Sequence, residues 1–323
     1  MRLSYLEKIL SARIKLFYGK TTPLRIAHFI TTRCNLKCKF CKCHTMKYNE
    51  MTTDEIKVSM QLFKKLGTFA WGFTGGEPFL REDIAELFQF AKKLNLFTSV
   101  VTNGTLLDKI DKVNPKHIDF IMVSFEGKEK RTMEIRGNKY VQAVYDTIEY
   151  LANRKINLCL SSTLDENSFE DICYTIEYAK SKNIFCSFQP IFNFLTQQED
   201  RKYLDNPIAL TGLCNNIDYL IQRKKKGDPI WNSLDYLYWV KNYGKVSLFY
   251  CYAGKLYATL MPDGTLRRCP VYGNERYSGN FKKDFCELNK EPHYCYCYPW
   301  CHIEYSLNFS LKLRTVLNTL NRL

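Results

Sequence analysis

Between about residues 24 and 191, short apolar segments alternate with segments of helical pattern. This alternation predicts a parallel sheet, because parallel strands are joined by crossovers that are usually helices. Six units are too few to close the usual eight-stranded barrel, so we expect an α/β fold with an open, partial barrel. The expected strands, bounded by polar residues or glycine, are Leu24–Thr32, Phe69–Thr74, Phe97–Thr102, Ile118–Ser124, Asn157–Leu164 and Ile184–Ile191.

The clearest helical segment lies between the first two expected strands. Thr52 and Glu55 have the spacing of a capping box, apolar residues recur after them at helical spacing, and Gly67 closes the segment. Apolar stripes of the same kind predict helices over residues 84–91 and 141–151.

Composition changes toward the C-terminus, where six cysteines fall between Cys251 and Cys301. We therefore expect a small cysteine-rich extension after the barrel, with a charged helical region between them. The predicted order is an N-terminal amphipathic helical segment, the barrel, the helical linker region, the cysteine-rich extension and a C-terminal amphipathic helix, at residues 1–23, 24–194, 195–250, 251–302 and 303–323.

The number of cysteines, 14 in 323 residues, is high for an ordinary cytosolic enzyme. A secreted disulfide scaffold is shorter and needs an export signal, whereas charges interrupt every apolar stretch near the N-terminus of this chain. No segment approaches the ~18 uninterrupted apolar residues of a membrane-spanning helix. We therefore expect a cytoplasmic protein whose cysteines are free to bind metal.

The formal net charge is +14. A basic surface attracts nucleic acid, anionic lipid or an acidic partner, and net charge does not choose among them. We find no RNA-binding signature and expect no nucleic-acid partner. Both ends of the chain combine apolar residues at helical spacing with Lys and Arg, which suggests peripheral contact with the inner face of the membrane. Packing of these stripes on the barrel or on a second subunit is the alternative.

Functional residues of parallel α/β folds gather at the carboxyl ends of the strands. Polar residues or glycines follow, or lie near the end of, each expected strand of this chain. In strand order they are Cys34, Gly75–Gly76–Glu77, Asn103–Gly104, Ser124 with Glu126, Ser161–Ser162, and Gln189. Their common position predicts one pocket at this edge of the sheet.

Cys34, Cys38 and Cys41 have C-x3-C-x2-C spacing in the loop after the first expected strand. Thiolates are soft ligands that suit iron–sulfur clusters. Three of them can hold three irons of a [4Fe–4S] cluster and leave the fourth open, as an open position marks catalytic metal sites. The spacing alone leaves a zinc site open, with Cys43 or His44 as the fourth ligand.

Two motifs together resemble the radical S-adenosylmethionine (SAM) superfamily over about residues 24–191. Phe40 precedes the third cysteine, matching C-x3-C-x-aromatic-C, and Gly75–Pro78 (GGEP) ends the second strand. The resemblance implies a partial (β/α)6 barrel whose open iron chelates the amino and carboxylate groups of SAM. It also implies that a reduced cluster cleaves SAM to methionine and a 5′-deoxyadenosyl radical, which removes a hydrogen atom from the substrate. Cys43 departs from the common signature, and we expect it not to be a ligand.

The resemblance assigns roles to the residues around the cysteines. Gly75 and Gly76 would allow backbone approach to the SAM amino group, with a plain tight turn as the alternative. Glu77 would accept a hydrogen bond from that amino group, or would simply place a charge at a helix N-terminus. Phe40 would lie near adenine or pack in the core.

Further candidates follow the later strands. By resemblance, Ser124 and Glu126 (VSFEG) match a position that contacts ribose. Arg136 (IRG) matches one that pairs with the SAM carboxylate, which a planar guanidinium can bond at both oxygens. Asn103 and Gln189 are additional candidates near the cofactor, although Asn103 also suits a turn before glycine.

The C-terminal cysteines form a second group. Cys251 and Cys269 lie on either side of an expected hairpin that turns at Pro262–Gly264, and a hairpin brings its ends together. This region resembles the SPASM/Twitch extension of radical SAM enzymes, which holds auxiliary [4Fe–4S] clusters. The last cysteines depart from the full pattern, so we expect one auxiliary cluster, with a structural zinc site as the alternative. The preferred ligands are Cys251, Cys269, Cys297 and Cys301, with Cys295 and Cys286 as rivals.

The predicted function is that of a radical SAM oxidoreductase or maturase acting on an unactivated C–H bond. By resemblance, the substrate is a peptide or protein, a carbohydrate or a lipid. The segment before Cys34 is too short for a separate peptide-recognition domain, which argues weakly against a peptide. The chemistry needs an electron donor such as ferredoxin or flavodoxin. The alternative is a non-catalytic zinc- or iron–sulfur-binding protein, which would not cleave SAM.

Overall fold

The computed structural model describes residues 21–137, 141–190, 207–242, 249–269, 275–276, 280–288 and 294–295, with Glu7, Ser11, Ala12, Ile14, Lys15 and Tyr18. The predicted ligands Cys297 and Cys301 lie outside the described residues, as do the C-terminal amphipathic segment and most of the N-terminal one.

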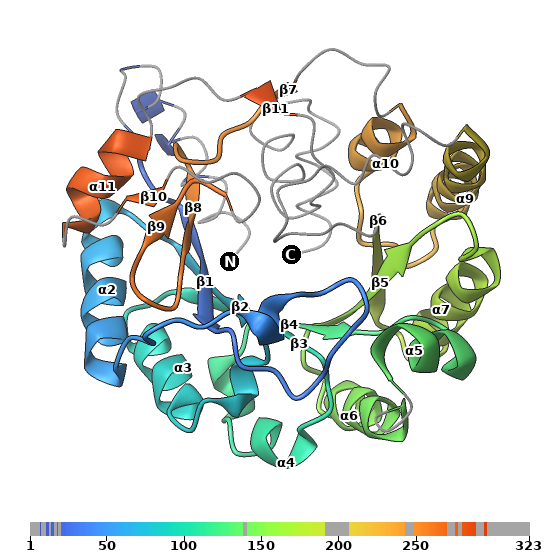
Figure 1. Ribbon diagram of the computed structural model, residues 1–323, viewed down its shortest axis with the longest axis horizontal. Helices are drawn as coiled ribbons and strands as arrows, with labels where there is room; N and C mark the ends of the chain where they lie inside the picture. The colour runs from blue at the N-terminus through green and yellow to red at the C-terminus, as the bar shows by residue number, and fades with distance from the viewer. Residues whose placement is uncertain are drawn as a thin grey trace.

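All six expected strands are present and form one parallel arc in the order β1-β2-β3-β4-β5-β6. The predicted α/β fold with a partial barrel is therefore confirmed, and Figure 1 shows helices along the outside of the curved sheet. The strands are β1 Arg25–Thr31, β2 Ala70–Gly75, β3 Phe97–Thr102, β4 Phe120–Ser124, β5 Leu158–Leu164 and β6 Phe185–Pro190.

Amphipathic helices connect these strands and bury one face on the sheet. Thr52 caps the first of them with a reciprocal capping box to Glu55, and Gly67 ends it at φ +105°, which confirms the expected start and stop. The helices are α2 Thr53–Leu66, α3 Ile84–Lys93, α4 Leu107–Ile110, α5 Glu129–Arg136, α6 Val141–Asn153 and α7 Phe169–Ser181, with 3-10 turns at Cys43–Thr45, Pro78–Leu80 and Pro115–His117.

The C-terminal region continues the barrel sheet. β8 pairs in parallel with β1 on the side opposite β2, and β9 and β10 extend the sheet in antiparallel fashion. The expected hairpin is thus present as β8–β9, hydrogen bonded to the first barrel strand. The remaining elements are α9 Pro207–Lys225, α10 Leu234–Lys241, β7 Phe249–Tyr250, β8 Tyr257–Leu260, β9 Leu266–Arg267, β10 Glu275–Arg276, α11 Phe281–Leu288 and β11 Tyr294–Cys295.

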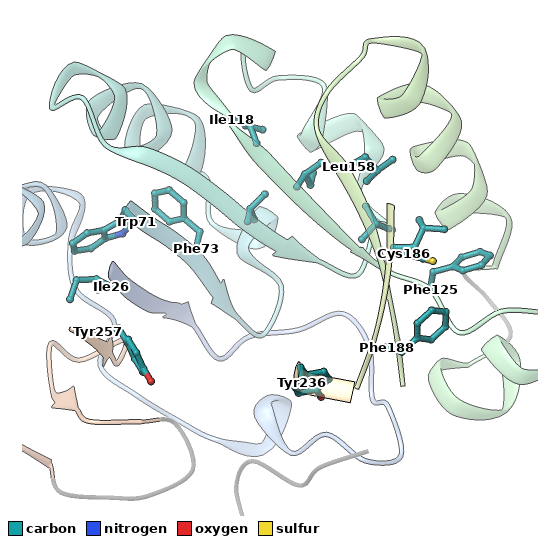
Figure 2. Packing of buried hydrophobic residues seen from close by; sticks show 14 of the residues in the cluster. Ile26, Trp71, Phe73, Ile118, Phe125, Leu158, Cys186, Phe188, Tyr236 and Tyr257 are labelled. Carbon is teal, nitrogen blue, oxygen red and sulfur yellow. The ribbon is translucent and has the colours of Figure 1, made fainter. Parts of the chain in front are cut away.

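The core lies between the sheet and its surrounding helices. Figure 2 shows Ile26, Trp71 and Phe73 on the neighbouring strands β1 and β2, with Phe188 of β6 and Tyr236 of α10 at the other end of the view. All five side chains are at most 1% exposed. Burial of this apolar layer fixes which side of each strand faces the helices. Because the strands are parallel, their polar carboxyl ends lie together at one edge of the sheet. None of the described helices is long and apolar enough to cross a membrane.

Candidate iron–sulfur and SAM site

The loop that carries the first cysteine group crosses the carboxyl edge of the sheet. It leaves β1 at Thr31 and returns to α2 at Thr53, and Figure 1 shows it in blue in front of the strand ends. The Lys39 amide donates to the carbonyl oxygen of Ile135 at 3.1 Å, so the middle of the loop docks on the end of α5. The three cysteines are therefore held at the carboxyl edge of the sheet.

The thiols of Cys34, Cys38 and Cys41 lie close enough to influence one another. Burial raises the pKa of Cys34 to about 11, and Glu77, Cys38 and Cys41 add to the rise. Burial also raises the pKa of Cys38, while Arg136 opposes the rise. A hydrogen bond with Cys43 lowers the pKa of Cys41 to about 6, against the effect of its burial. Metal binding would release the protons held by the first two thiols.

The donor set fits a four-iron cluster better than a single metal ion. Within the described part of the chain, no three His, Cys, Asp or Glu side chains converge closely enough to hold one ion. A cluster makes a different demand, since each thiolate binds a separate iron of the cube. Three soft sulfur ligands on one loop meet that demand, and the Leu36 amide already donates to Cys34 Sγ at 3.4 Å, as amides do around cluster thiolates.

The two glycines of the GGE motif are required by contacts within the chain itself. A Cβ at Gly75 would lie 2.2 Å from the carbonyl oxygen of Thr31, and a Cβ at Gly76 would lie 2.1 Å from that of Arg33. The Gly76 and Glu77 amides donate to those same two carbonyls at 2.8 and 2.9 Å. The end of β2 is thus sealed against the start of the cysteine loop. Contact with the SAM amino group stays a prediction.

Glu77 ties the GGE turn to the end of β3. Its carboxylate is fully buried and accepts hydrogen bonds from the Phe79 amide, the Thr102 hydroxyl and the Asn103 amide at 3.1, 2.9 and 2.7 Å. Burial raises the pKa of Glu77 to about 7, and the three hydrogen bonds oppose the rise. The carboxylate therefore caps the 3-10 turn Pro78–Leu80, in line with the helix N-terminus alternative, and its bonds to Thr102 and Asn103 add a structural role that the sequence did not indicate.

Asn103 is both a turn residue and a link to the cysteine loop. Its Oδ1 accepts from the Thr105 amide at 2.9 Å, as an Asx turn does. Its Nδ2 lies 2.9 Å from Asn35 Oδ1 and 3.9 Å from Cys34 Sγ. Asn35 in turn donates to the Thr105 hydroxyl at 2.7 Å. Sequence reasoning missed Asn35 and Thr105, whose only signal was a position beside a motif residue.

Glu126, which is fully buried, and Arg136, which is partly buried, form an ion pair beside the cysteine loop. Arg136 Nε donates to Glu126 Oε1 at 2.8 Å, and the other carboxylate oxygen accepts from the Thr163 amide at 2.9 Å. Arg136 Nη1 lies 3.9 Å from Cys38 Sγ, and its guanidinium stacks over Phe40 with 5.5 Å to the ring centroid. Glu126 and Cys38 raise the pKa of Arg136 although burial acts to lower it.

The other predicted residues lie at the same edge. Ser124, the last residue of β4, is partly exposed and pairs with Ser161 on β5. Gln189 is partly exposed on β6, opposite Thr163. The structure thus brings the nine predicted cofactor residues to the edge that carries Cys34, Cys38 and Cys41, and their contacts with a cofactor stay predictions.

Cys43 lies beside the cluster cysteines, because it shares a hydrogen bond with Cys41. It is buried, and its thiol donates to the carbonyl oxygen of Gly75 at 3.6 Å. The expectation that Cys43 is not a ligand stays a prediction, with this contact in its favour.

In the second cysteine group, Cys251 and Cys269 are both buried. Cys269 follows β9, which pairs with β8 in antiparallel fashion. The Tyr257 hydroxyl lies 3.5 Å from Cys251 Sγ. Cys251 itself precedes a second turn, at Ala253–Leu256. Of the rival ligands, Cys286 is exposed on α11 and Cys295 lies in β11.

The hairpin also contacts the cysteine loop directly. The Met51 amide donates to the Pro262 carbonyl oxygen at 2.8 Å, and Arg267 Nη2 donates to the Tyr48 hydroxyl at 3.3 Å. The two cysteine-bearing regions therefore share a boundary through residues 48–51.

Comparison with known families identifies the domain that carries this edge of the sheet. Residues 29–179 match the model of the radical SAM superfamily, and this range contains the three cysteines, the GGE motif and Arg136. Residues 29–179 are a radical SAM domain. The predicted family is thereby confirmed, and with it the SAM-binding [4Fe–4S] cluster and SAM as the cofactors of the domain.

Curated relatives match this chain over part of their length. An Fe-coproporphyrin III synthase of Methanosarcina barkeri is 24% identical over 205 residues, covering 61% of this chain and 50% of the relative. A probable GTP 3′,8-cyclase of Thermococcus kodakarensis is 30% identical over 172 residues, covering 50% of this chain and 54% of the relative. The chain thus spans about half the length of these two relatives.

Solved structures share the fold over nearly the whole chain. SuiB of Streptococcus suis, bound to the precursor peptide SuiA, has a TM-score of 0.63 at 17% identity and is matched over 90% of this chain and 69% of its own. The protein anSMEcpe, with bound AdoMet and the Cp18Cys peptide, has a TM-score of 0.59 at 17% identity, over 92% of this chain and 98% of its own. The likeness extends beyond the radical SAM domain.

Proposed function

We propose that this protein is a radical SAM enzyme that cleaves SAM reductively and removes a hydrogen atom from an unactivated C–H bond of a peptide or protein. One observation carries the proposal. The loop with Cys34, Cys38 and Cys41 is sealed onto the GGE turn at the carboxyl edge of a partial barrel, within a radical SAM domain. An open iron held there would face the residues predicted to bind SAM.

The chain's own residues would hold and orient the cofactors. The three thiolates would bind three irons, and the Gly75–Gly76 backbone would border the cofactor on the β2 side. When bound, the cluster and SAM supply one-electron chemistry that yields methionine and a 5′-deoxyadenosyl radical able to attack an unactivated C–H bond. Asn103 and the Glu126–Arg136 pair would fix the geometry of the loop by their contacts with it.

Removal of any one cluster thiolate tests the chemistry. Cys34→Ala, Cys38→Ala and Cys41→Ala should each abolish 5′-deoxyadenosine formation by the anaerobically reconstituted protein, because two thiolates do not hold the cube securely. Cys173→Ala, a half-buried cysteine on α7, is the matched control and should retain it. Near-normal 5′-deoxyadenosine from any of the first three variants would disprove the cluster assignment and favour a non-catalytic metal-binding protein.

A peptide or protein substrate is supported by the two solved structures, both of which hold peptides and share the fold over at least 90% of this chain. The test is anaerobic reconstitution with SAM and reductant, followed by addition of separate peptide, carbohydrate and lipid fractions. We expect the peptide fraction to stimulate 5′-deoxyadenosine formation most. Stimulation by the carbohydrate or lipid fraction alone would overturn this choice. The same assay, run with ferredoxin or flavodoxin in place of chemical reductant, tests the electron donor.

We further propose one auxiliary [4Fe–4S] cluster in the C-terminal region. Its support is that Cys251 and Cys269 are both buried and flank a hairpin that borders the cysteine loop. A variant with Cys34, Cys38 and Cys41 all changed to Ala should still bind about four irons and four sulfides after reconstitution. Stoichiometric zinc without iron in that variant would favour a structural zinc site.

A further inference from the structure

Arg136 is held from one side by a carboxylate that is itself buried and hydrogen bonded to the sheet. Arg136 Nε and Nη2 both donate to Glu126 Oε1, and the Glu126 side chain is fully buried. The second oxygen of Glu126 accepts from the amide and the hydroxyl of Thr163 on β5. The sheet therefore fixes the carboxylate, and the carboxylate fixes the guanidinium.

The other side of the same guanidinium faces the cysteine loop. Arg136 Nη1 lies 3.9 Å from Cys38 Sγ, and Phe40 stacks against the guanidinium plane. The preceding residue, Ile135, accepts the 3.1 Å hydrogen bond from the Lys39 amide. Two side-chain contacts and one backbone hydrogen bond thus set the distance between the end of α5 and the predicted ligand Cys38.

We propose that Arg136 is a positioning residue of the iron–sulfur cluster rather than the partner of the SAM carboxylate. Braced by Glu126, it donates to the Cys38 sulfur, and the positive end of the Arg136–Glu126 pair thus lies toward the cluster. Hydrogen bonds and charge at the ligand sulfurs set the reduction potential of such clusters, and a fixed cation favours the reduced form, which carries one more negative charge. This assignment rests on the proposed function.

The reconstituted holoenzyme tests the assignment through potential and affinity measured separately. Arg136→Gln removes the charge and should make one-electron reduction of the SAM-free cluster about tenfold less favourable, which is about 59 mV for a one-electron couple. EPR-monitored redox titration measures this shift. SAM affinity, followed by the SAM-induced change in the EPR spectrum, should stay within about twofold of wild type.

Arg131→Gln is the matched control for damage to α5. Arg131 is also buried on α5, but it pairs with Asp165 at 3.1 Å rather than with the cysteine loop. We expect the potential of the Arg131→Gln cluster to equal that of wild type. An equal shift in both variants would mean that loss of helix packing, not the Arg136 charge, moves the potential, and would overturn the proposal.

If Arg136→Gln leaves the reduction potential unchanged and lowers SAM affinity tenfold or more, Arg136 pairs with the SAM carboxylate and the proposal is wrong. If Arg136→Gln assembles no cluster, Arg136→Lys decides, because it keeps the charge. A near-wild-type potential in Arg136→Lys supports the proposal, and a tenfold less favourable reduction, or no cluster, overturns it. Failure of the radical SAM function itself would appear differently, as a wild-type protein that does not cleave SAM.

Discussion

At the residue scale, the site is organised by two buried glutamates that follow alternate strands. Glu77 follows β2 and is held by Thr102 and Asn103 at the end of β3, and Glu126 follows β4 and is held by Thr163 of β5. In both cases the polar end of the next strand supplies the hydrogen-bond donors that a buried carboxylate needs. Each glutamate then fixes a loop that borders the cluster.

The close approach at Gly76 gives a steric prediction. Gly76→Ala should reduce iron retention and SAM binding of the reconstituted protein, because the new Cβ would lie 2.1 Å from a backbone carbonyl that cannot move without the cysteine loop. Gly72→Ala is the control, since its Cβ would meet only movable side-chain ends of Arg25 and Ser99 at 3.0 and 3.1 Å. Iron content and SAM affinity are measured for both variants. Wild-type values in Gly76→Ala would contradict the prediction.

His28 gives a prediction of pH dependence. The ring is fully buried on β1, edge-on to Trp71 at 5.6 Å, and neither ring nitrogen has a hydrogen-bond partner among the described residues. Burial, then Arg81, lowers its pKa to about 3, with Asp83 opposing. The pKa of His28 in the folded protein lies below its value of about 6.5 in the unfolded chain. The contribution of neutral His28 to the free energy of unfolding is therefore complete above pH 6.5 and falls as the pH drops toward 3.

Protonation of His28 in the unfolded chain should lower the free energy of unfolding by about 2 kcal/mol at pH 5 relative to pH 7. His28→Leu removes the titrating group, so wild type should lose about 2 kcal/mol more than the variant between these two pH values. Urea unfolding of both proteins at pH 7 and pH 5 measures the difference. An equal loss in the two proteins would show that His28 does not titrate in this range.

At the element scale, the two sides of the parallel arc are closed in different ways. On the β1 side, β8 adds a parallel strand, so β1 is hydrogen bonded on both sides. On the β6 side, the Pro229 carbonyl and the Trp231 amide bond to Cys186, and the fully buried Asn232 side chain bonds both the amide and the carbonyl of Phe188. Asn232 therefore substitutes for a seventh strand and protects a free sheet edge.

Asn232→Ala should lower the free energy of unfolding by about 2–4 kcal/mol, because it leaves a buried backbone donor and a buried acceptor of Phe188 without partners. Asn242→Ala is the control, since Asn242 makes an exposed hydrogen bond to Tyr238 and should change stability by less than about 1 kcal/mol. Urea unfolding measures both. A change in Asn232→Ala no larger than that of the control would show that the edge is held by other contacts.

At the scale of the whole molecule, the cysteine loop lies between two regions that are far apart in sequence. The end of α5 contacts it at Lys39, and the β8–β9 hairpin contacts it at Tyr48 and Met51. The loop is thus held from the barrel and from the C-terminal extension together. A substitution that disturbs either region should therefore change the geometry of the cysteine loop.

Contact with a membrane surface is also a property of the whole chain, since its predicted elements are the two ends. If the ends bind anionic bilayers, the full-length protein floats with anionic vesicles at low salt and is released at high salt, because headgroup attraction is screened. A protein lacking residues 1–20 should then float less. If both proteins stay in the soluble fraction, the apolar residues at the two ends pack on the barrel or on a second subunit instead. A lipid substrate then loses its main support.

The sequence by itself determined the positions of the six strands along the chain and indicated the cluster loop. Alternation of apolar and polar residues is a local signal, so the six strands were located to within one or two residues, and cysteine spacing together with GGEP is a local motif. Only the tertiary structure decided what Glu77, Arg136, Asn35 and Asn232 contact. Their partners lie on other segments, 26, 98, 70 and 44 positions away in the sequence, and a side chain's contacts depend on the neighbours that folding brings to it.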